Sequence, residues 1–218
     1  MLRLRLDRAD PPLRHVLCLG AHCDDLEIGC GGTVLALAGS PNPPAFTWVV
    51  FSSDAAREAE ARSSAERFLR GAPSAQIIIK KFRDGFLPYD GAAVKEAFEE
   101  LKGAGSPDLV VTHYRHDLHQ DHRLISELTW NTYRDQLILE YEIPKYDGDL
   151  GAPNVFVPLD DPLCRRKIEM ILAGFPSQAG KRWFSEDLFR SLLRLRGMES
   201  NAPSGHAEAF YCRKLVVG

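Results

Sequence analysis

The feature that most constrains the fold of this chain is an alternation, over its first two thirds, of short apolar runs with longer segments of helical pattern. Short apolar runs that end in a turn are typical of buried strands, and the amphipathic segments between them are typical of helices. Strands that alternate with helices form βαβ units, so we predict a Rossmann-like α/β fold with a mainly parallel sheet and helices on both faces. The predicted strands are residues 15–19, 46–51, 76–80 and 108–112, and the predicted helices are residues 28–38, 55–69, 92–102 and 121–134.

The last third of the chain has a weaker pattern. Proline and glycine cluster over residues 144–158, which predicts irregular structure there. We expect helices over residues 162–173 and 186–196, and a final strand over residues 209–217 that joins the sheet. No internal repeat or linker divides the 218 residues, so we predict a single domain over residues 1–218.

The composition argues against several classes of protein. The net charge is −3 and the basic residues are scattered among acids, so we expect no nucleic-acid partner. No apolar run is long enough to span a membrane, and residues 1–12 alternate apolar with charged residues, unlike a signal peptide. The five cysteines include no Cys-x-x-Cys pair, so we expect free thiols in a cytoplasmic protein.

A first polar segment, residues 21–27 (AHCDDLE), directly follows the first predicted strand. It places His22, Asp24 and Asp25 in one tight turn before a helix. Adjacent carboxylates repel each other and are costly to bury, and a divalent cation would relieve both problems. The alternative is that Asp24 or Asp25 only caps the helix that follows.

A second polar segment, residues 112–122 (THYRHDLHQDH), follows the fourth predicted strand and contains four of the seven histidines. The alternative to a site is a solvated histidine-rich loop. However, His119 and His122 are three residues apart and lie on one side of a helical turn. Ligands in α/β sheets bind beyond the carboxyl ends of strands, where both segments lie.

Together the two segments predict a metal site. Two imidazoles and one carboxylate with one open position are the usual ligands of catalytic zinc. The segments contain one histidine and one carboxylate more than the metal needs. A general base and an oxyanion donor are what hydrolysis requires, so the surplus favours a hydrolase over a structural metal site.

Both segments resemble the motifs of the LmbE/PIG-L family of zinc-dependent de-N-acetylases. Residues 21–27 correspond to the family motif AHPDDxE, and residues 117–122 correspond to the motif DxHxDH. Weaker similarities lie at Asp84-Gly85 and at residues 207–210. The resemblance implies a zinc-dependent N-deacetylase acting on an N-acetylated sugar or glycoconjugate, with Fe²⁺ as an alternative metal, and it leaves open whether the chain forms a homo-oligomer.

The resemblance also implies roles for six residues. Asp24 matches the general base that activates water, and His119 matches the histidine that stabilises the oxyanion or protonates the leaving amine. Asp121 matches the acid that orients His119, a role that fixes an imidazole tautomer. The implied metal ligands are His22, Asp25 and His122.

Cys23 and Gln120 stand where the family often has proline, and neither change removes a ligand. We do not expect Cys23 to bind the metal, because neighbouring residues of an extended segment point to opposite sides. Arg57 matches the family's substrate-contacting arginine or is a solvated residue at a helix start. Asp84 lines the pocket or only makes a turn with Gly85, and we favour the turn.

Three further histidines are expected outside the site. His206 reaches the mouth of the site or is an ordinary loop residue, and we favour the loop. His113 and His116 line the wall of the pocket or lie in a solvated loop, and we favour the loop.

Three other functions are considered. The same metal site would also suit a non-sugar amide or an ester, and a non-catalytic protein would hold its metal with no open position. A nucleotide-binding Rossmann protein is disfavoured, because no Gly-x-Gly-x-x-Gly follows the first strand and Asp24 and Asp25 would repel a phosphate. Gly29, Gly31 and Gly32 come only after the acidic turn.

Overall fold

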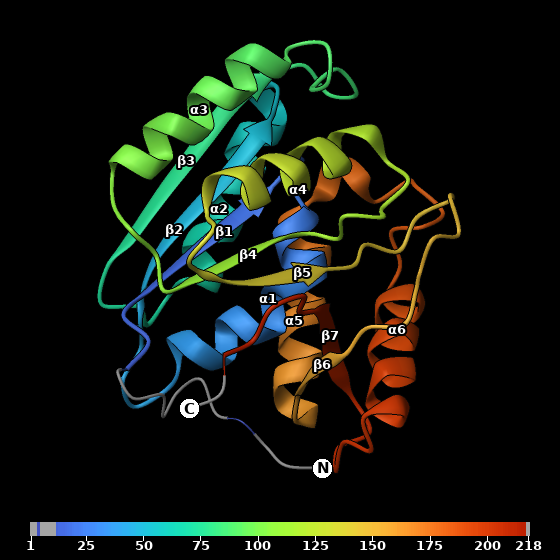
Figure 1. Cartoon of the computed structure of the whole chain (residues 1–218). Helices are drawn as coiled ribbons and strands as arrows, with labels where there is room; N and C mark the ends of the chain where they lie inside the picture. The colour runs from blue at the N-terminus through green and yellow to red at the C-terminus, as the bar shows by residue number, and fades with distance from the viewer. Residues whose placement is uncertain (1–3, 5–11, 217–218) are drawn as a thin grey trace.

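The computed structural model describes residue 4 and residues 12–216 (Figure 1). Most of residues 1–12, for which the sequence predicts no signal peptide, lie outside the described residues. No helix within the described residues combines the length and the apolar character needed to cross a membrane. The strands are β1 (His15–Gly20), β2 (Ala45–Ser52), β3 (Ala75–Phe82), β4 (Leu109–His113), β5 (Leu137–Tyr141), β6 (Val155–Pro158) and β7 (Ala207–Tyr211). The helices are α1 (Asp25–Ala38), α2 (Ala55–Phe68), α3 (Gly91–Gly103), α4 (Gln120–Thr132), α5 (Asp161–Gly174) and α6 (Glu186–Glu199), with a short 3₁₀ helix, η2 (Pro176–Gln178).

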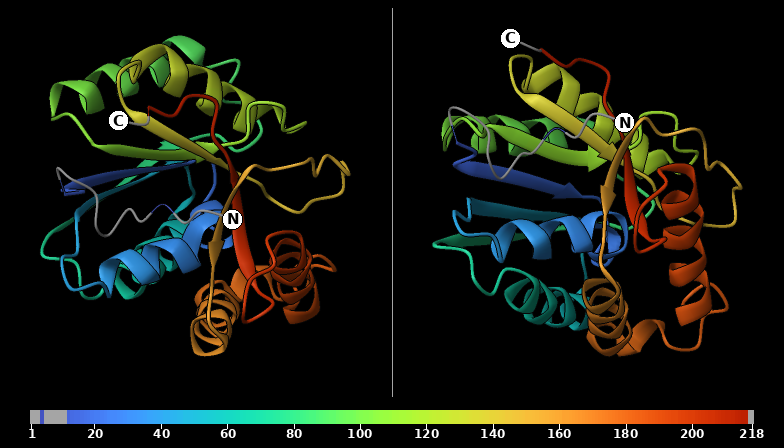
Figure 2. Two further views of the ribbon diagram at one scale, coloured as in Figure 1. Left: turned by 60° about the horizontal axis from the view of Figure 1, so that its bottom comes forward. Right: turned by 90° about the horizontal axis from the view of Figure 1, so that it is seen from below.

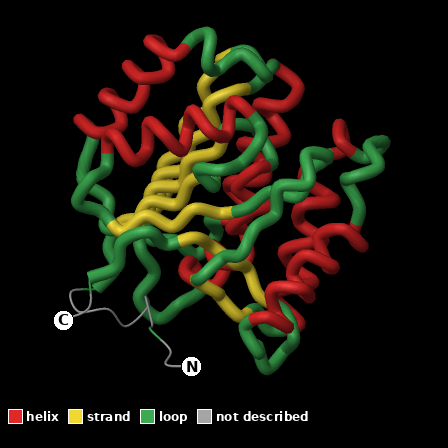
Figure 3. The backbone as a smooth tube through the Cα atoms, turned by 45° about the vertical axis from the view of Figure 1, so that its right-hand side comes forward, coloured by secondary structure: helices red, strands yellow, loops and turns green. Residues whose placement is uncertain are grey.

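The described strands form one twisted sheet of seven, in the order β3-β2-β1-β4-β5-β7-β6 (Figure 3). Strands β1 to β5 run parallel, and β7 is antiparallel to both of its neighbours, β5 and β6. The predicted α/β fold with a mainly parallel sheet is therefore confirmed. Because β1 lies between β2 and β4, the chain reverses its direction across the sheet there, and ligands of open α/β sheets bind at such a point.

Helices cover both faces of the sheet, as Figure 2 shows for the pairs α1 with α2 and α3 with α4. Side chains alternate along a strand, so each central strand contributes to two cores. Val16 and Cys18 of β1 pack into the core beneath α1, α2 and α5, whereas Leu17 and Leu19 pack into the core beneath α3 and α4. This double burial explains why the central strands β1, β2 and β4 are almost entirely apolar, whereas the edge strand β3 is only partly buried and contains Lys80 and Lys81.

Two strands, β5 and β6, were missing from the sequence prediction. Strand β5 contains Glu140, a fully buried carboxylate that accepts hydrogen bonds from the Trp130 indole and the Arg115 amide. Strand β6 lies inside the Pro- and Gly-rich region that was expected to be irregular. The last strand starts and ends earlier than the predicted 209–217. It ends at Tyr211 because the next amide, that of Cys212, donates to the side chain of Asn154. Val217 lies outside the described residues.

Helix α1 packs unusually closely against the sheet and its neighbours, and its glycines allow this approach. A Cβ on Gly29 would lie 2.2 Å from Cδ2 of Tyr141, and a Cβ on Gly31 would lie 2.6 Å from Cε1 of Phe68. The Tyr141 ring cannot easily retreat, because its hydroxyl donates to the Leu19 carbonyl at 2.9 Å. The glycines that follow the acidic turn therefore serve packing.

We expect Gly29→Ala to lower the free energy of unfolding by about 1–3 kcal/mol, the usual cost of an overpacked core. Urea denaturation of the purified protein measures this change. Gly103→Ala is the matched control, because a Cβ on Gly103 meets nothing within 4 Å. Equal stability of the Gly29 variant and the wild type would contradict this account of α1.

Candidate metal-binding site

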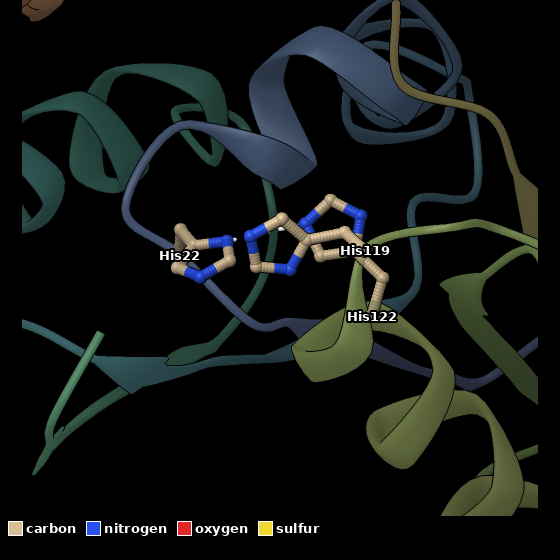
Figure 4. A group of neighbouring side chains, drawn as sticks. All are labelled: His22, His119 and His122. Carbon is tan, nitrogen blue, oxygen red and sulfur yellow. Dashed lines mark hydrogen bonds between the residues drawn. The ribbon is translucent and has the colours of Figure 1, made fainter. Parts of the chain in front are cut away.

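The two polar segments meet at the carboxyl edge of the sheet. They follow β1 and β4, which are hydrogen-bonded neighbours, so the two loops lie side by side. Figure 4 shows the result: His22 comes from the loop before α1, and His119 and His122 come from the start of α4. The three rings gather in one place, with ring centroids 4.6–5.1 Å apart.

The three predicted metal ligands converge. His22 Nδ1 lies 3.1 Å from His122 Nε2 and 3.3 Å from Asp25 Oδ2, and His122 Nε2 lies 3.6 Å from Asp25 Oδ1. Tetrahedral zinc with bonds of about 2.0–2.1 Å holds its ligand atoms about 3.3 Å apart. The spacing of these donor atoms therefore fits one small divalent cation.

The partners of the two imidazoles indicate where their protons lie. His22 Nε2 faces the carboxylates of Asp84 at 3.1 Å and Asp121 at 3.2 Å, and His122 Nδ1 faces Asp117 Oδ2 at 2.9 Å. A ring nitrogen that faces a carboxylate carries the proton, which leaves a lone pair on the other nitrogen. His22 Nδ1 and His122 Nε2 then face each other across 3.1 Å, an approach that a shared proton or a metal ion would stabilise.

Without a metal, a proton takes this role. Burial alone would lower the pKa of His22, but the carboxylates of Asp25, Asp121 and Asp84 together raise it well above its usual value. Burial lowers the pKa of His122 to about 3, so this ring stays neutral. A neutral imidazole is the form that binds a metal.

The adjacent acids Asp24 and Asp25 have different environments. Burial raises the pKa of Asp24 against the opposing charge of Arg57, whose Nη2 lies 3.1 Å away. Burial also disfavours the charge on Asp25, but the imidazoles, led by His122, hold its pKa well below its usual value. Asp24 is thus the better proton acceptor and Asp25 the better permanent anion.

Neither acid caps α1 as the alternative interpretation required. Asp24 occupies the N-cap position, but its side chain makes no capping hydrogen bond. Asp25 accepts a hydrogen bond from the amide of His22, which precedes the helix, at 2.6 Å.

His119 is half-buried at the edge of the cluster. Its Nδ1 accepts a hydrogen bond from the Asp121 amide at 3.3 Å, so a neutral His119 carries its proton on Nε2. Burial, together with the nearby His22, lowers the pKa of His119 and favours this neutral form. The residue is therefore a hydrogen-bond donor at the site.

The contacts of the Asp121 carboxylate are with groups other than the His119 ring. It accepts hydrogen bonds from the Gly85 and Leu87 amides at 2.8 and 3.1 Å, and it faces His22. Through these contacts it fixes the loop after β3 to the site. Its contact with His119 is made by its backbone amide, and the orienting role implied by the family stays a prediction.

Three residues of the site have no role in the sequence prediction. The expectation of a solvated His113 is wrong: this ring is fully buried, stacks on His122 at 3.9 Å and lies 3.1 Å from Asp25 Oδ2. Asp117 holds His122 and is itself held by Lys145 Nζ at 2.8 Å. Asp117 opens the second motif and His113 ends a strand, so both had a sequence signal, whereas Lys145 had none.

The remaining predictions have mixed outcomes. The solvated alternative for Arg57 is wrong, because it pairs with Asp24, and Asp84 does contact the site through His22. His206 lies 3.2 Å from Asp161 at the start of α5. Cys23 donates its thiol proton to the Ser52 carbonyl at 3.4 Å, and burial raises its pKa to about 12, so it is no thiolate ligand. His116 is exposed, as expected.

Comparison with known families gives one match. Residues 17–133 match the family model described as PIG-L, GlcNAc-PI de-N-acetylase. This stretch is more than half of the chain and includes both polar segments. A comparison with curated proteins gave no match.

Several solved structures share the fold. N,N′-diacetylchitobiose deacetylase from Pyrococcus horikoshii aligns with a TM-score of 0.69 and 21% identity, over 95% of this chain and 86% of that chain. A deacetylase triple mutant of the teicoplanin biosynthetic pathway gives 0.68 and 17%, over 91% and 97%. GalB, the 4-carboxy-2-hydroxymuconate hydratase of Pseudomonas putida KT2440, gives 0.69 and 16%, over 94% and 98%. Identities this low show a shared fold only.

We expect Asp117→Asn to weaken zinc binding by about 10–100-fold, because a neutral partner supports the His122 imidazole less well than a carboxylate. Competition between the protein and a chromogenic chelator measures the affinity. Asp149→Asn is the matched control: Asp149 contacts Lys145 and the Leu118 amide but makes no contact with His122. An equal loss in both variants would mean that Asp117 has no special role.

Proposed function

This chain belongs to the PIG-L family, and we propose that it is a metal-dependent hydrolase that removes an N-acetyl group from a substrate containing an amino sugar. The observation that carries the proposal is the convergence of donor atoms of His22, Asp25 and His122, which lie 3.1–3.6 Å from one another. We propose these three residues as the metal ligands and zinc as the metal, with Fe²⁺ as the alternative suited to the same donors.

A bound divalent metal would polarise the substrate carbonyl and lower the pKa of water. Asp24 is placed to take the proton of the attacking water, since its carboxylate is buried beside the ligand Asp25 and its pKa is raised. Arg57, 3.1 Å from Asp24, holds this carboxylate in position. Asp24 therefore serves as the general base in this proposal.

His119 is placed to stabilise the charge that develops on the carbonyl oxygen. Its neutral ring offers the Nε2 proton as a fixed donor, and donors of this kind lower the barrier to acyl transfer. The proton held by Asp24 then passes to the amide nitrogen, since His119 could deliver a proton only as an imidazolium, the form that its lowered pKa disfavours. The C–N bond breaks, and acetate and the free amine leave.

The nature of the substrate rests on the family rather than on the fold. The fold is shared by sugar deacetylases and by a hydratase, so fold alone does not select a reaction. Hydrolysis is favoured because Asp24 and His119 supply a base and a donor beyond the proposed ligands. A site that only stored metal would need neither.

The decisive experiment combines metal analysis with an assay of amine release. Zinc-loaded protein is incubated with N-acetylglucosamine, N,N′-diacetylchitobiose, an N-acetylated glycoconjugate and a non-sugar acetamide. Free amine and acetate in equal amounts from the sugars would support the proposal. Release only from the non-sugar amide would reassign the substrate, and tightly bound metal with no release from any compound would favour the non-catalytic alternative.

Asp24→Ala should lower kcat by about 10²–10⁴-fold, the usual contribution of a general base, while one metal ion per chain stays bound. Steady-state amine release and elemental analysis of the same sample test both parts. Asp90→Ala is the control, because this exposed acid makes no side-chain capping bond to α3. Full activity of the Asp24 variant would remove Asp24 from the mechanism.

Removal of the metal with a chelator should abolish amine release, and one equivalent of zinc should restore it. Dialysis against the chelator followed by titration with zinc gives the stoichiometry. Activity that survives complete metal removal would contradict metal dependence.

A further inference from the structure

A buried ion pair joins α5 and β7 to the middle of α1. Lys167 Nζ lies 2.5 Å from Glu208 Oε1, and the two side chains are only 3% and 2% exposed. Glu208 belongs to the segment 207–210 that resembles the family but has no role in the chemistry above. Burial of two charges costs several kcal/mol of desolvation, so their presence requires a structural or functional reason.

The pair bonds to backbone groups that lie one turn apart in α1. Lys167 Nζ donates to the Ile28 carbonyl at 2.6 Å, and Glu208 Oε1 accepts from the Gly32 amide at 2.7 Å. In a regular helix that carbonyl and that amide would be joined by one i to i+4 bond. Glu208 Oε2 also accepts from the amide and the hydroxyl of Thr33, at 2.7 and 2.6 Å.

The contacts of the pair define two parts of α1. The ammonium lies at the last carbonyl of the first part, residues 25–28, and the carboxylate lies at the first amides of the second part, residues 32–38. Each charge has the sign that attracts the backbone group it contacts, so the pair holds the two parts together.

The packing around Gly32 leaves room for the Glu208 carboxylate but not for a side chain on residue 32. A Cβ on Gly32 would lie 2.5 Å from Leu159 and 3.0 Å from Glu208 Oε1, so a side chain at this position would displace the carboxylate. A cavity of about 20 Å³ borders the pair and is lined in part by Ile28 and Gly29. Beside this small cavity, the backbone of α1 is held at Ile28 by the hydrogen bond from Lys167.

We propose that Lys167 and Glu208 are positioning residues for the metal site and act through the first turn of α1. This turn starts with Asp25, whose carboxylate must lie within reach of both His22 and His122. The ion pair fixes the other end of the same turn, three residues along the chain at Ile28. The proposal rests on the proposed function in one respect, that the converged donors bind a metal.

The test measures metal binding by the full-length chain for Glu208→Gln and Lys167→Met. Metal-free protein is titrated with Zn²⁺ against a chelator and, separately, with Co²⁺, whose visible absorption reports the ligand geometry. We expect both variants to lose about 10–100-fold in zinc affinity, as for other residues that orient ligands, and to show an altered cobalt spectrum. Circular dichroism verifies that each variant is folded at the assay temperature.

Two further variants separate positioning from stability. Val34→Ala removes core packing from the second part of α1 and should lower the free energy of unfolding while leaving zinc affinity and the cobalt spectrum unchanged. Thr33→Val removes only the hydroxyl bond to Glu208, so it should fold even where Glu208→Gln does not, and it should lose zinc affinity by a smaller factor.

The proposal is overturned if folded Lys167 and Glu208 variants bind zinc with wild-type affinity and show the wild-type cobalt spectrum, whatever their stability. The proposal is also overturned if Val34→Ala loses as much zinc affinity as the Lys167 and Glu208 variants. Failure of the wild-type chain to bind zinc would refute the proposed function as well, and this outcome is distinct from the other two.

Discussion

The close approach of two imidazole nitrogens, His22 Nδ1 and His122 Nε2, is the constraint on which the site depends. At 3.1 Å these nitrogens need a shared proton or metal ion, because two bare lone pairs would repel each other. The acids outside the pair set the orientation of each ring: Asp84 and Asp121 hold His22, and Asp117 holds His122. The protein thus fixes the ring orientations before any ligand arrives, which is the preorganisation that tight and selective metal binding needs.

The strand order of the sheet brings these two histidines together. Because β1 and β4 are neighbours, two segments more than ninety residues apart in sequence meet at one edge. The sequence pattern predicted the first four strands and all six described helices. The central strands stand out because strands buried on both faces are mostly apolar. It missed β5, where buried Glu140 interrupts an apolar run, because the partners that satisfy this carboxylate lie on other elements.

Like the fold, the candidate site could be predicted only in part from the sequence. Residues within the two motifs could be found from spacing alone, and the structure brings His22, Asp25 and His122 together. His113 had a signal in its place directly after a predicted strand, but a solvated loop was favoured for it, because burial of a histidine depends on what packs over it. Lys145 comes from the loop between β5 and β6, and its contact with Asp117 exists only after the sheet has formed. Motifs therefore identify the chemical groups, and tertiary structure decides how each is held.

The bonds from Glu208 to Gly32 and Thr33 span 176 and 175 residues of sequence, nearly the whole chain. Contacts of such separation form late, because the loop entropy is lost before they stabilise anything. Helix α1 is synthesised before α5 and β7, so the bonds from Lys167 and Glu208 to its backbone can form only after those segments have been made. During synthesis on the ribosome, a nascent chain that already carries both polar motifs therefore lacks these bonds until β7 has emerged.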